Sequence, residues 1–133
     1  MSTVLTDLSA GHEFEPVTFS IETERVRAYL AATGDDLALY EASNVAPPLA
    51  IAAFALGALL EEVTLPEGTL HISENLSYSK AVPLGAAVDC RARLAQRSVR
   101  AGMVVSVLET EISFENEVAL MARATVMSPG AAS

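Results

Sequence analysis

The sequence predicts an α+β fold in which an antiparallel sheet wraps round one central apolar helix. Three observations favour this class. A short alternating segment comes early, a nearly all-apolar helical segment follows it, and from Thr69 onward the hydrophobic period changes from helical to two. Helices and strands are therefore segregated along the chain, as in α+β proteins. We expect a single domain over residues 1–133, with its core at about 11–128.

The N-terminal part begins without a periodic pattern. Residues 1–11 are expected to form a loose lead-in, because the spacing of their apolar side chains fits neither a helix nor a strand. Residues 14–21 then alternate between apolar and polar side chains, which predicts a short strand. Pro16 has no backbone N–H to donate, so this strand should lie at a sheet edge or begin at that point.

A helix is predicted after this strand. Ser20 or Thr23 can cap its first turn, because a side-chain oxygen accepts a hydrogen bond from an amide that has no partner within the helix. Apolar residues recur at helical spacing up to Thr33, and Gly34 is a natural C-terminal stop. Residues 36–43 are expected to form a weak second helical turn.

The central helix is predicted to run from Pro47 and Pro48 to about Val63. Proline suits the first turn, because the amides there have no acceptor within the helix. Apolar residues cover nearly every face, so we expect burial on most sides. The longest apolar run, from Ala46 to Leu60, is too short to span a bilayer.

Four strands are predicted after the helix, separated by turns that contain Gly, Pro or Asn. Their alternation is typical of a half-buried antiparallel meander. A single sheet of few strands leaves an edge open, so we expect dimerisation through an edge strand. The predicted strands are residues 70–80, 86–98, 103–115 and 118–128.

Charge and composition exclude several functions. The formal net charge of −9, from 17 acidic and 8 basic residues, argues against nucleic acid as a partner. The lone Cys90 excludes an internal disulfide and a cysteine metal cage, and it fits a small core residue. No leader and no membrane span are evident, so we expect a cytoplasmic protein. One dense basic group could meet an acidic carrier protein or simply be an exposed strand face: Arg91, Arg93, Arg97 and Arg100.

Four segments together carry a resemblance to a known family. The first reads Gly34-Asp35-Asp36-Leu37-Ala38-Leu39-Tyr40, and the second, Val45-Ala46-Pro47-Pro48-Leu49, leads into the central helix. The third runs from Leu70 to Lys80, and the fourth is the turn Val82-Pro83-Leu84-Gly85. In this order they resemble the MaoC-like hydratase/dehydratase family of hotdog folds. The resemblance implies a sheet wrapped round the central helix.

The chain departs from the family signature, which is Gly-Asp-x-Asn-Pro-x-His. Gly34 and Asp35 match, but Tyr40 stands where the family has its histidine. A phenol normally titrates near pH 10 and an imidazole near 6.5, so a phenol is a poor base at neutral pH. Ala46-Pro47-Pro48 and His71 are similar to the N-terminal-type branch, which includes non-catalytic subunits of heterodimeric fatty-acyl dehydratases.

The resemblance implies addition or removal of water across C2 and C3 of an acyl-CoA or acyl carrier protein thioester, with no metal and no cofactor. Family members use the Asp and the His to activate a water, and a backbone amide at the start of the central helix polarises the thioester carbonyl. The catalytic candidates are therefore Asp35, Tyr40 at the histidine position, and His71 as a substitute imidazole. The resemblance gives a substrate-binding role to Ala46, Pro47, Pro48 and Leu49.

Each catalytic candidate also fits a structural role. Asp35 suits a turn carboxylate after Gly34, and the ring of Tyr40 could pack against the central helix. Nothing in the sequence shows that His71 faces Asp35, and His12 lies in the lead-in, where we expect exposure to solvent. The chain has no Gly-rich phosphate loop, no Gly-x-Ser-x-Gly motif and no His/Cys metal spacing, which excludes nucleotide-binding proteins, serine hydrolases and zinc enzymes.

Four functions remain open on the sequence alone. The leading interpretation is a MaoC-like subunit that has lost the Asp/His pair and that binds the acyl chain beside a catalytic hotdog partner, in a homodimer or a heterodimer. The second is an active (R)-specific enoyl-CoA hydratase or 3-hydroxyacyl dehydratase that uses Asp35 with Tyr40 or His71. The third is a hotdog acyl-CoA thioesterase, and the fourth is a domain that only senses acyl-CoA.

Overall fold

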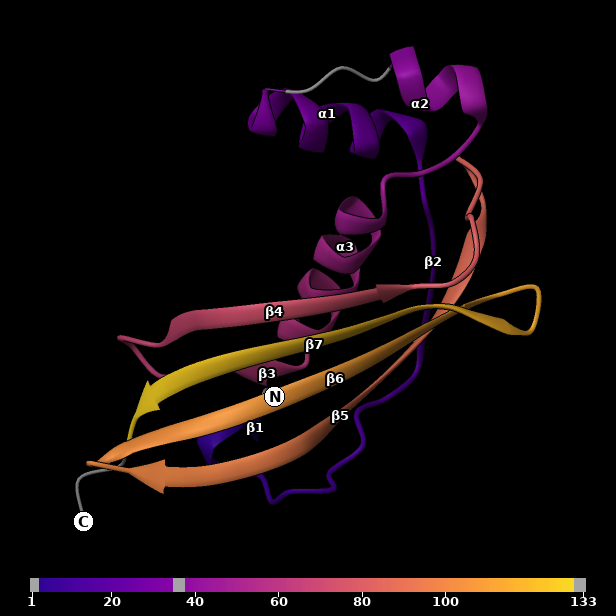
Figure 1. Cartoon of the computed structure of the whole chain (residues 1–133). Helices are drawn as coiled ribbons and strands as arrows, with labels where there is room; N and C mark the ends of the chain where they lie inside the picture. The colour runs from indigo at the N-terminus through magenta and orange to yellow at the C-terminus, as the bar shows by residue number, and fades with distance from the viewer. Residues whose placement is uncertain (1–2, 35–37, 131–133) are drawn as a thin grey trace.

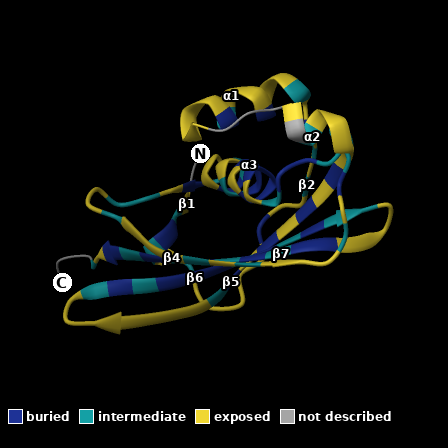
Figure 2. Ribbon diagram, turned by 45° about the horizontal axis from the view of Figure 1, so that its top comes forward, coloured by how far each residue is buried: buried dark blue, intermediate teal, exposed yellow. Residues whose placement is uncertain are grey.

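The protein is built as a five-stranded antiparallel sheet with helices on one face (Figure 1). The structure, a computed structural model, describes residues 3–34 and 38–130. α3 (Pro48–Leu60) lies on the sheet and α1 (Thr23–Thr33) lies over α3, so the molecule has three layers (Figure 2). The strand order is β2-β5-β6-β7-β4, which makes β2 and β4 the edges. The strands of this sheet are β2 (Val17–Ser20), β4 (Leu70–Tyr78), β5 (Ala87–Arg100), β6 (Met103–Phe114) and β7 (Glu117–Pro129).

The meander forms as the alternation predicted. The four long strands begin and end within two residues of the predicted bounds. Two-residue turns join β5 to β6 and β6 to β7, and their residues have positive φ: Ala101 and Gly102 in the first, Glu115 and Asn116 in the second. One face of the central strands is buried against the helices, and its largest fully buried side chains include Leu94, Leu108, Ile112 and Leu120.

The helix α3 is covered on two sides and uncovered on a third. The side that faces the sheet and α1 is buried, through Ala50, Ile51, Ala52, Phe54, Ala55 and Leu59. α1 holds it from above: the guanidinium of Arg25 lies 4.2 Å from the centroid of the Phe54 ring, and Tyr29 meets that ring edge-on. A stripe of four residues, Leu49, Ala53, Gly57 and Leu60, stays exposed, with Leu49 54% and Leu60 37% accessible. The expectation of burial on most sides therefore has to be corrected for this stripe.

The end of α3 also differs from the expectation. The helix stops at Leu60, and Val63–Thr64 form the short strand β3, which pairs in parallel with β1 (Thr3–Val4). The lead-in is consequently not loose. Leu5, in a 3-10 turn directly after β1, is fully buried in a second hydrophobic cluster with Phe14, Leu59 and Val63. Strands of two residues are too short to show a period, which is why the sequence pattern did not predict them.

The N-terminal strand and helix are close to the expectation. β2 spans Val17–Ser20, shorter than the predicted 14–21, and it lies at a sheet edge as Pro16 indicated. Neither Ser20 nor Thr23 caps α1, so that prediction was wrong: the cap residue is Glu22, without a side-chain hydrogen bond, and Thr23 is already helical. Gly34 ends α1 in the left-handed conformation at φ 78°, as predicted.

The second short helix, α2 (Ala38–Ser43), follows the undescribed residues 35–37. It leads into the start of α3, on the side of the molecule where β4 ends and β5 begins (Figure 1). Among the described residues, no helix combines the length and the apolar character needed to cross a membrane.

The burial of Leu5 predicts that the lead-in contributes to stability. Leu5→Ala removes a fully buried side chain between β1 and the end of α3, so we expect a loss of about 2–4 kcal/mol in the free energy of unfolding, measured by urea titration. Leu8→Ala is the matched control, because Leu8 is only partly buried against the same cluster and should cost clearly less. Equal losses for the two variants would show that the lead-in is not anchored through Leu5.

Candidate functional site

The candidate site lies where α2 leads into α3. Tyr40, in α2, is partly buried and packs against the main hydrophobic cluster, and its carbonyl accepts a hydrogen bond of 3.1 Å from the amide of Val45. Asp35, the carboxylate that the sequence pattern pairs with it, lies outside the described residues. The ring of Tyr40 thus packs against the core, as its structural role predicts. Its backbone lies close to the start of α3, so Tyr40 also stands at the edge of the candidate site.

The four residues with a predicted substrate-binding role are brought together at the start of α3. Ala46 is fully buried, and its amide donates to the carbonyl of Val82 at 2.7 Å. Pro47 is the N-cap residue, and its carbonyl accepts from the amides of Ala50 at 3.1 Å and Ile51 at 3.2 Å. Pro47 and Pro48 have no N–H, so Leu49 carries the first backbone donor of the helix.

The start of α3 can stabilise negative charge on a nearby oxygen. The first N–H groups of a helix carry a partial positive charge, which favours a developing negative charge on an oxygen that lies close to them. Because the two prolines supply no donor and the amides of Ala50 and Ile51 donate to the carbonyl of Pro47, this capacity is concentrated at the amide of Leu49. Leu49 is itself exposed, so a ligand can reach it.

The two histidines of the chain lie elsewhere. His71 belongs to β4, where its Nε2 is 4.0 Å from Oε2 of Glu74, and it sits at the opposite end of that strand from the side where α2 lies (Figure 1). His12 stacks edge-on against Phe14, with 4.9 Å between the ring centroids. Within the described part of the chain, neither imidazole has a hydrogen bond to Tyr40. The structure thus brings Tyr40 near the start of α3 and leaves His71 on the sheet.

The connection between β4 and β5 supports the start of α3, a contact that the sequence pattern did not predict. The connection from β4 to β5 carries Val82, which is fully buried and accepts the Ala46 bond, and Gly85, whose amide donates to the carbonyl of Ile21 at 2.7 Å. This connection therefore holds both the start of α3 and the end of β2. Pro83 and Gly85 predicted a turn here, but a turn signal does not say which backbone groups the turn will bind.

The arginine group does not form one basic patch. Arg93 pairs with Glu109 at 2.9 Å, and Glu109 also holds Arg123 of β7 at 2.9 Å. Arg97 donates to the backbone carbonyl of Thr6 at 2.9 Å, which ties β5 to the N-terminal segment. Arg91 and Arg100 are exposed. Two of the four guanidinium groups are thus engaged within the chain, as expected for a strand face and not for a free anion-binding patch.

Cys90 is a core residue. It faces the helices from β5 and is buried, and burial, with a smaller contribution from the negative charge of Glu62, raises the pKa of its thiol to about 11. The thiol is therefore protonated at neutral pH and is no nucleophile. Across residues 3–34 and 38–130, no group of three or more His, Cys, Asp or Glu side chains is arranged to hold a metal ion.

Comparison with known proteins gives one family and a set of shared folds. A family model described as FAS1-like, dehydratase domain region matches residues 9–123. None of the curated proteins compared with the sequence matches it. Among solved structures, the HadBC 3R-hydroxyacyl-ACP dehydratase complex of Mycobacterium tuberculosis superposes with a TM-score of 0.73 at 20% identity, over 93% of this chain and 100% of that chain.

Two further structures have the same fold. A MaoC-like dehydratase from Rhodospirillum rubrum gives a TM-score of 0.73 at 16% identity, over 99% of this chain and 100% of that one. An R-hydratase from Pseudomonas aeruginosa gives 0.66 at 19% identity, over 92% of this chain and 83% of that one. Identities this low establish a common fold and no more. The predicted α+β hotdog fold is thereby confirmed.

The raised pKa of Cys90 predicts an unreactive thiol. At pH 8 we expect Ellman's reagent to react with the folded protein at least roughly a hundredfold more slowly than with the protein unfolded in guanidinium, because burial and a higher pKa both lower the accessible thiolate. The unfolded thiol loses its proton near pH 9.0 and the folded one near 11, so Cys90 lowers stability as pH rises through this window. Cys90→Ala should lack this component, and equal pH dependence in the two proteins would contradict the shift.

Proposed function

The chain belongs to the FAS1-like, dehydratase domain region family, and we propose that it acts on acyl-CoA or acyl carrier protein thioesters as a MaoC-like hydratase/dehydratase subunit without a complete acid/base pair. In this role it binds the acyl group beside a catalytic hotdog partner. The fold that it shares with the HadBC 3R-hydroxyacyl-ACP dehydratase complex supports both the substrate class and the presence of a partner.

One observation carries the proposal, namely the position of the imidazoles. The chain has only two histidines, and both lie in the described part of the structure, on the N-terminal segment and on β4. The position that the resemblance gives to the family histidine holds Tyr40, whose ring packs against the core. A phenol at this place can orient water but is a poor general base at neutral pH. Asp35 is then left without its companion in this chain.

The start of α3 retains the second feature of the family, a helix N-terminus that can polarise the thioester carbonyl. The N-terminus of this helix of 13 residues favours negative charge on a thioester oxygen. It is formed by Ala46, Pro47, Pro48 and Leu49. The exposed stripe of α3 continues from there along the helix axis for about 16 Å, given the rise of about 1.5 Å per residue. An acyl chain whose carbonyl sits at Leu49 can lie against this stripe, and a partner that covers the stripe would shield it from water.

The partner is inferred from two uncovered surfaces that adjoin each other. β4 is a sheet edge with unpaired backbone groups, and its apolar side chains Leu70, Ile72 and Tyr78 are exposed. α3 contacts β4 as well as β6 and β7, and we infer that its exposed stripe faces the side of the β4 edge. A second hotdog subunit would cover both surfaces, because its own edge strand would pair with β4 and its apolar surface would cover the stripe of α3. Homodimer and heterodimer meet this requirement equally.

An active hydratase is the second candidate, and one contact favours it. His71 and Glu74 form an imidazole–carboxylate pair at 4.0 Å on the same open edge. In a dimer built through β4 this pair lies at the subunit junction, where it can supply the base that Tyr40 lacks. A hydration assay on substituted variants separates the two candidates.

The substitution Tyr40→His tests the impaired-subunit proposal directly. We expect the purified wild-type protein to be stabilised against heat by crotonyl-CoA but to hydrate it hardly at all. Restoring the imidazole should raise the hydration rate by roughly a hundredfold, the scale of one general base, and Asp35→Asn in the same variant should remove the gain. The measurement is the loss of enoyl-thioester absorbance.

Different outcomes of this assay identify the alternatives. Wild-type hydration that survives Tyr40→Phe and is lost in His71→Ala would make the chain an enzyme that uses the β4 imidazole. Wild-type hydration that only Asp35→Asn abolishes would show that one carboxylate suffices. Release of free CoA without hydration would identify a thioesterase.

The open edge of β4 predicts an oligomer that one charge disrupts. Ile72 is 51% exposed on β4, and Ile72→Lys puts an ammonium on the edge that a partner strand would cover, so we expect the mass measured by light scattering to fall to that of one chain. Val99→Lys is the matched control, because Val99 is 60% exposed near the far end of β5 and should leave the mass unchanged. If the wild-type chain is monomeric alone, the same pair is compared in the complex with a co-expressed catalytic subunit. An oligomer that tolerates Ile72→Lys does not form through β4.

A further inference from the structure

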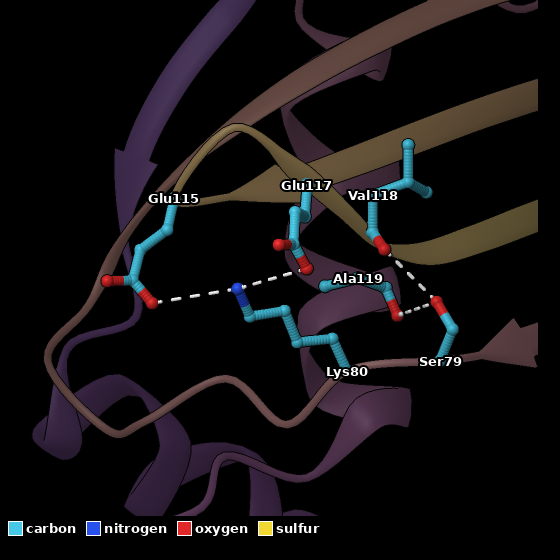
Figure 3. A network of polar contacts seen from close by, with 6 residues as sticks. All are labelled: Ser79, Lys80, Glu115, Glu117, Val118 and Ala119. Carbon is cyan, nitrogen blue, oxygen red and sulfur yellow. Dashed lines mark hydrogen bonds and ion pairs between the residues drawn. The ribbon is translucent and has the colours of Figure 1, made fainter.

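Lys80 links the connection between β4 and β5 to the turn between β6 and β7. Its Nζ lies 3.6 Å from Oε1 of Glu115 and 3.5 Å from Oε2 of Glu117, at the turn between β6 and β7 (Figure 3). It also lies 5.4 Å from the centroid of the Phe114 ring. The side chain is only 27% exposed, so it is held against the turn and does not extend freely into solvent.

The neighbouring backbone reinforces this contact. The hydroxyl of Ser79 donates to the carbonyls of Val118 at 3.0 Å and Ala119 at 3.4 Å (Figure 3). The backbone amides of Ser79 and Lys80 also donate to the carbonyl of Ala119. The chain that leaves β4 is thus fastened to the start of β7 for two residues beyond the strand. Lys80 is the last residue of this attachment.

The turn itself bears a feature that suits the contact. Glu115 has φ 53°, a left-handed conformation that Gly or Asn adopts at lower cost than a glutamate. A glutamate at this position weakens the turn but brings a carboxylate beside Lys80. At this position the chain therefore has a residue that forms an ion pair with Lys80, although glycine or asparagine would suit the backbone conformation better.

Beyond Lys80 the same connection reaches the start of α3. Two residues on, the carbonyl of Val82 accepts the amide of Ala46 at 2.7 Å, and the next residue after Ala46 is the N-cap residue Pro47. Val82 and Ala46 are both fully buried, so a shift of the connection moves the start of α3 with it.

We infer that Lys80 is a positioning residue, which fixes the N-terminus of α3 through Val82 and Ala46 and so holds the donor groups that face a thioester carbonyl. The inference rests on the proposed function for its effect on ligand, but the mechanical link does not. An isolated surface ion pair would contribute little. This ammonium has two carboxylates and an aromatic ring around it, and the connection that it fastens ends at a buried hydrogen bond.

The test compares three variants by hydrogen exchange and by ligand binding. Lys80→Met keeps the alkyl stem over Phe114 and removes the charge. Glu115→Gly removes one carboxylate but relieves the backbone, so it should leave the unfolding midpoint equal or higher. Arg27→Met makes the same change in net charge on α1, where Arg27 pairs with Glu24 at 3.5 Å, and it serves as the control.

We expect the amide of Ala46 to exchange roughly three- to tenfold faster in Lys80→Met and faster also in Glu115→Gly, whereas the amide of Leu108 at the sheet centre is unchanged. Crotonyl-CoA should bind more weakly by a similar factor while CoA binds as before, and Lys80→Arg should restore both. Arg27→Met should behave as wild type.

Two results would overturn the inference. One is faster exchange at Ala46 and Leu108 by the same factor, which would make Lys80 a contributor to global stability alone. The other is unchanged exchange at Ala46 in Lys80→Met. If wild-type protein does not bind crotonyl-CoA, the proposed function fails, and the exchange of Ala46 still decides whether Lys80 holds the helix start.

Discussion

The structure depends on the need to cover one helix that has no charged residue. From Pro48 to Leu60, α3 contains only apolar side chains and one glycine, so exposure of any face to water is unfavourable. The sheet covers one side, and α1 covers another through Arg25, Tyr29 and their contacts with Phe54. The described part of the chain has no further element for the third side, where Leu49 and Leu60 remain exposed. A helix of this composition with an open stripe supports the proposed partner, because large exposed apolar patches are rare on monomers.

The glycine within that stripe supports the same conclusion. A Cβ built at Gly57 would meet no atom of the described chain within 4 Å, so nothing there requires a glycine. A glycine in a helix interior costs about 1 kcal/mol relative to alanine. Its presence is explained if something outside the subunit, a partner backbone or an acyl chain, approaches the helix closely at this point. The fold class and the open stripe thus have one origin, the sequence of α3.

The sequence correctly predicted the strands and helix ends that a local pattern of residues determines. Alternation predicted the four long strands to within two residues at each end. The proline pair and Gly34 marked the start of α3 and the end of α1, because φ and N–H chemistry act within a few residues. Contacts between distant segments were missed. The pairing of β1 with β3 and the bond between Ala46 and Val82 depend on where the sheet carries each segment, which no window of sequence contains. The arginines show the same limit, since only the fold reveals that Arg93 faces Glu109.

The tyrosine at the position that the resemblance gives to a histidine is easier to understand in terms of this packing. An imidazole at the edge of the site must stay accessible and polar, whereas the ring of Tyr40 packs against the cluster that includes α3. A ring that packs in this way buries apolar area, and gains in stability often conflict with the needs of an active site. The backbone at the start of α3 is held independently of the Tyr40 ring, because the amide of Ala46 donates to the carbonyl of Val82 and the amide of Val45 donates to the carbonyl of Tyr40. Under the proposed function, the thioester would bind at the start of α3 and water would be activated at the position of Tyr40, so a subunit could lose the second capacity and keep the first.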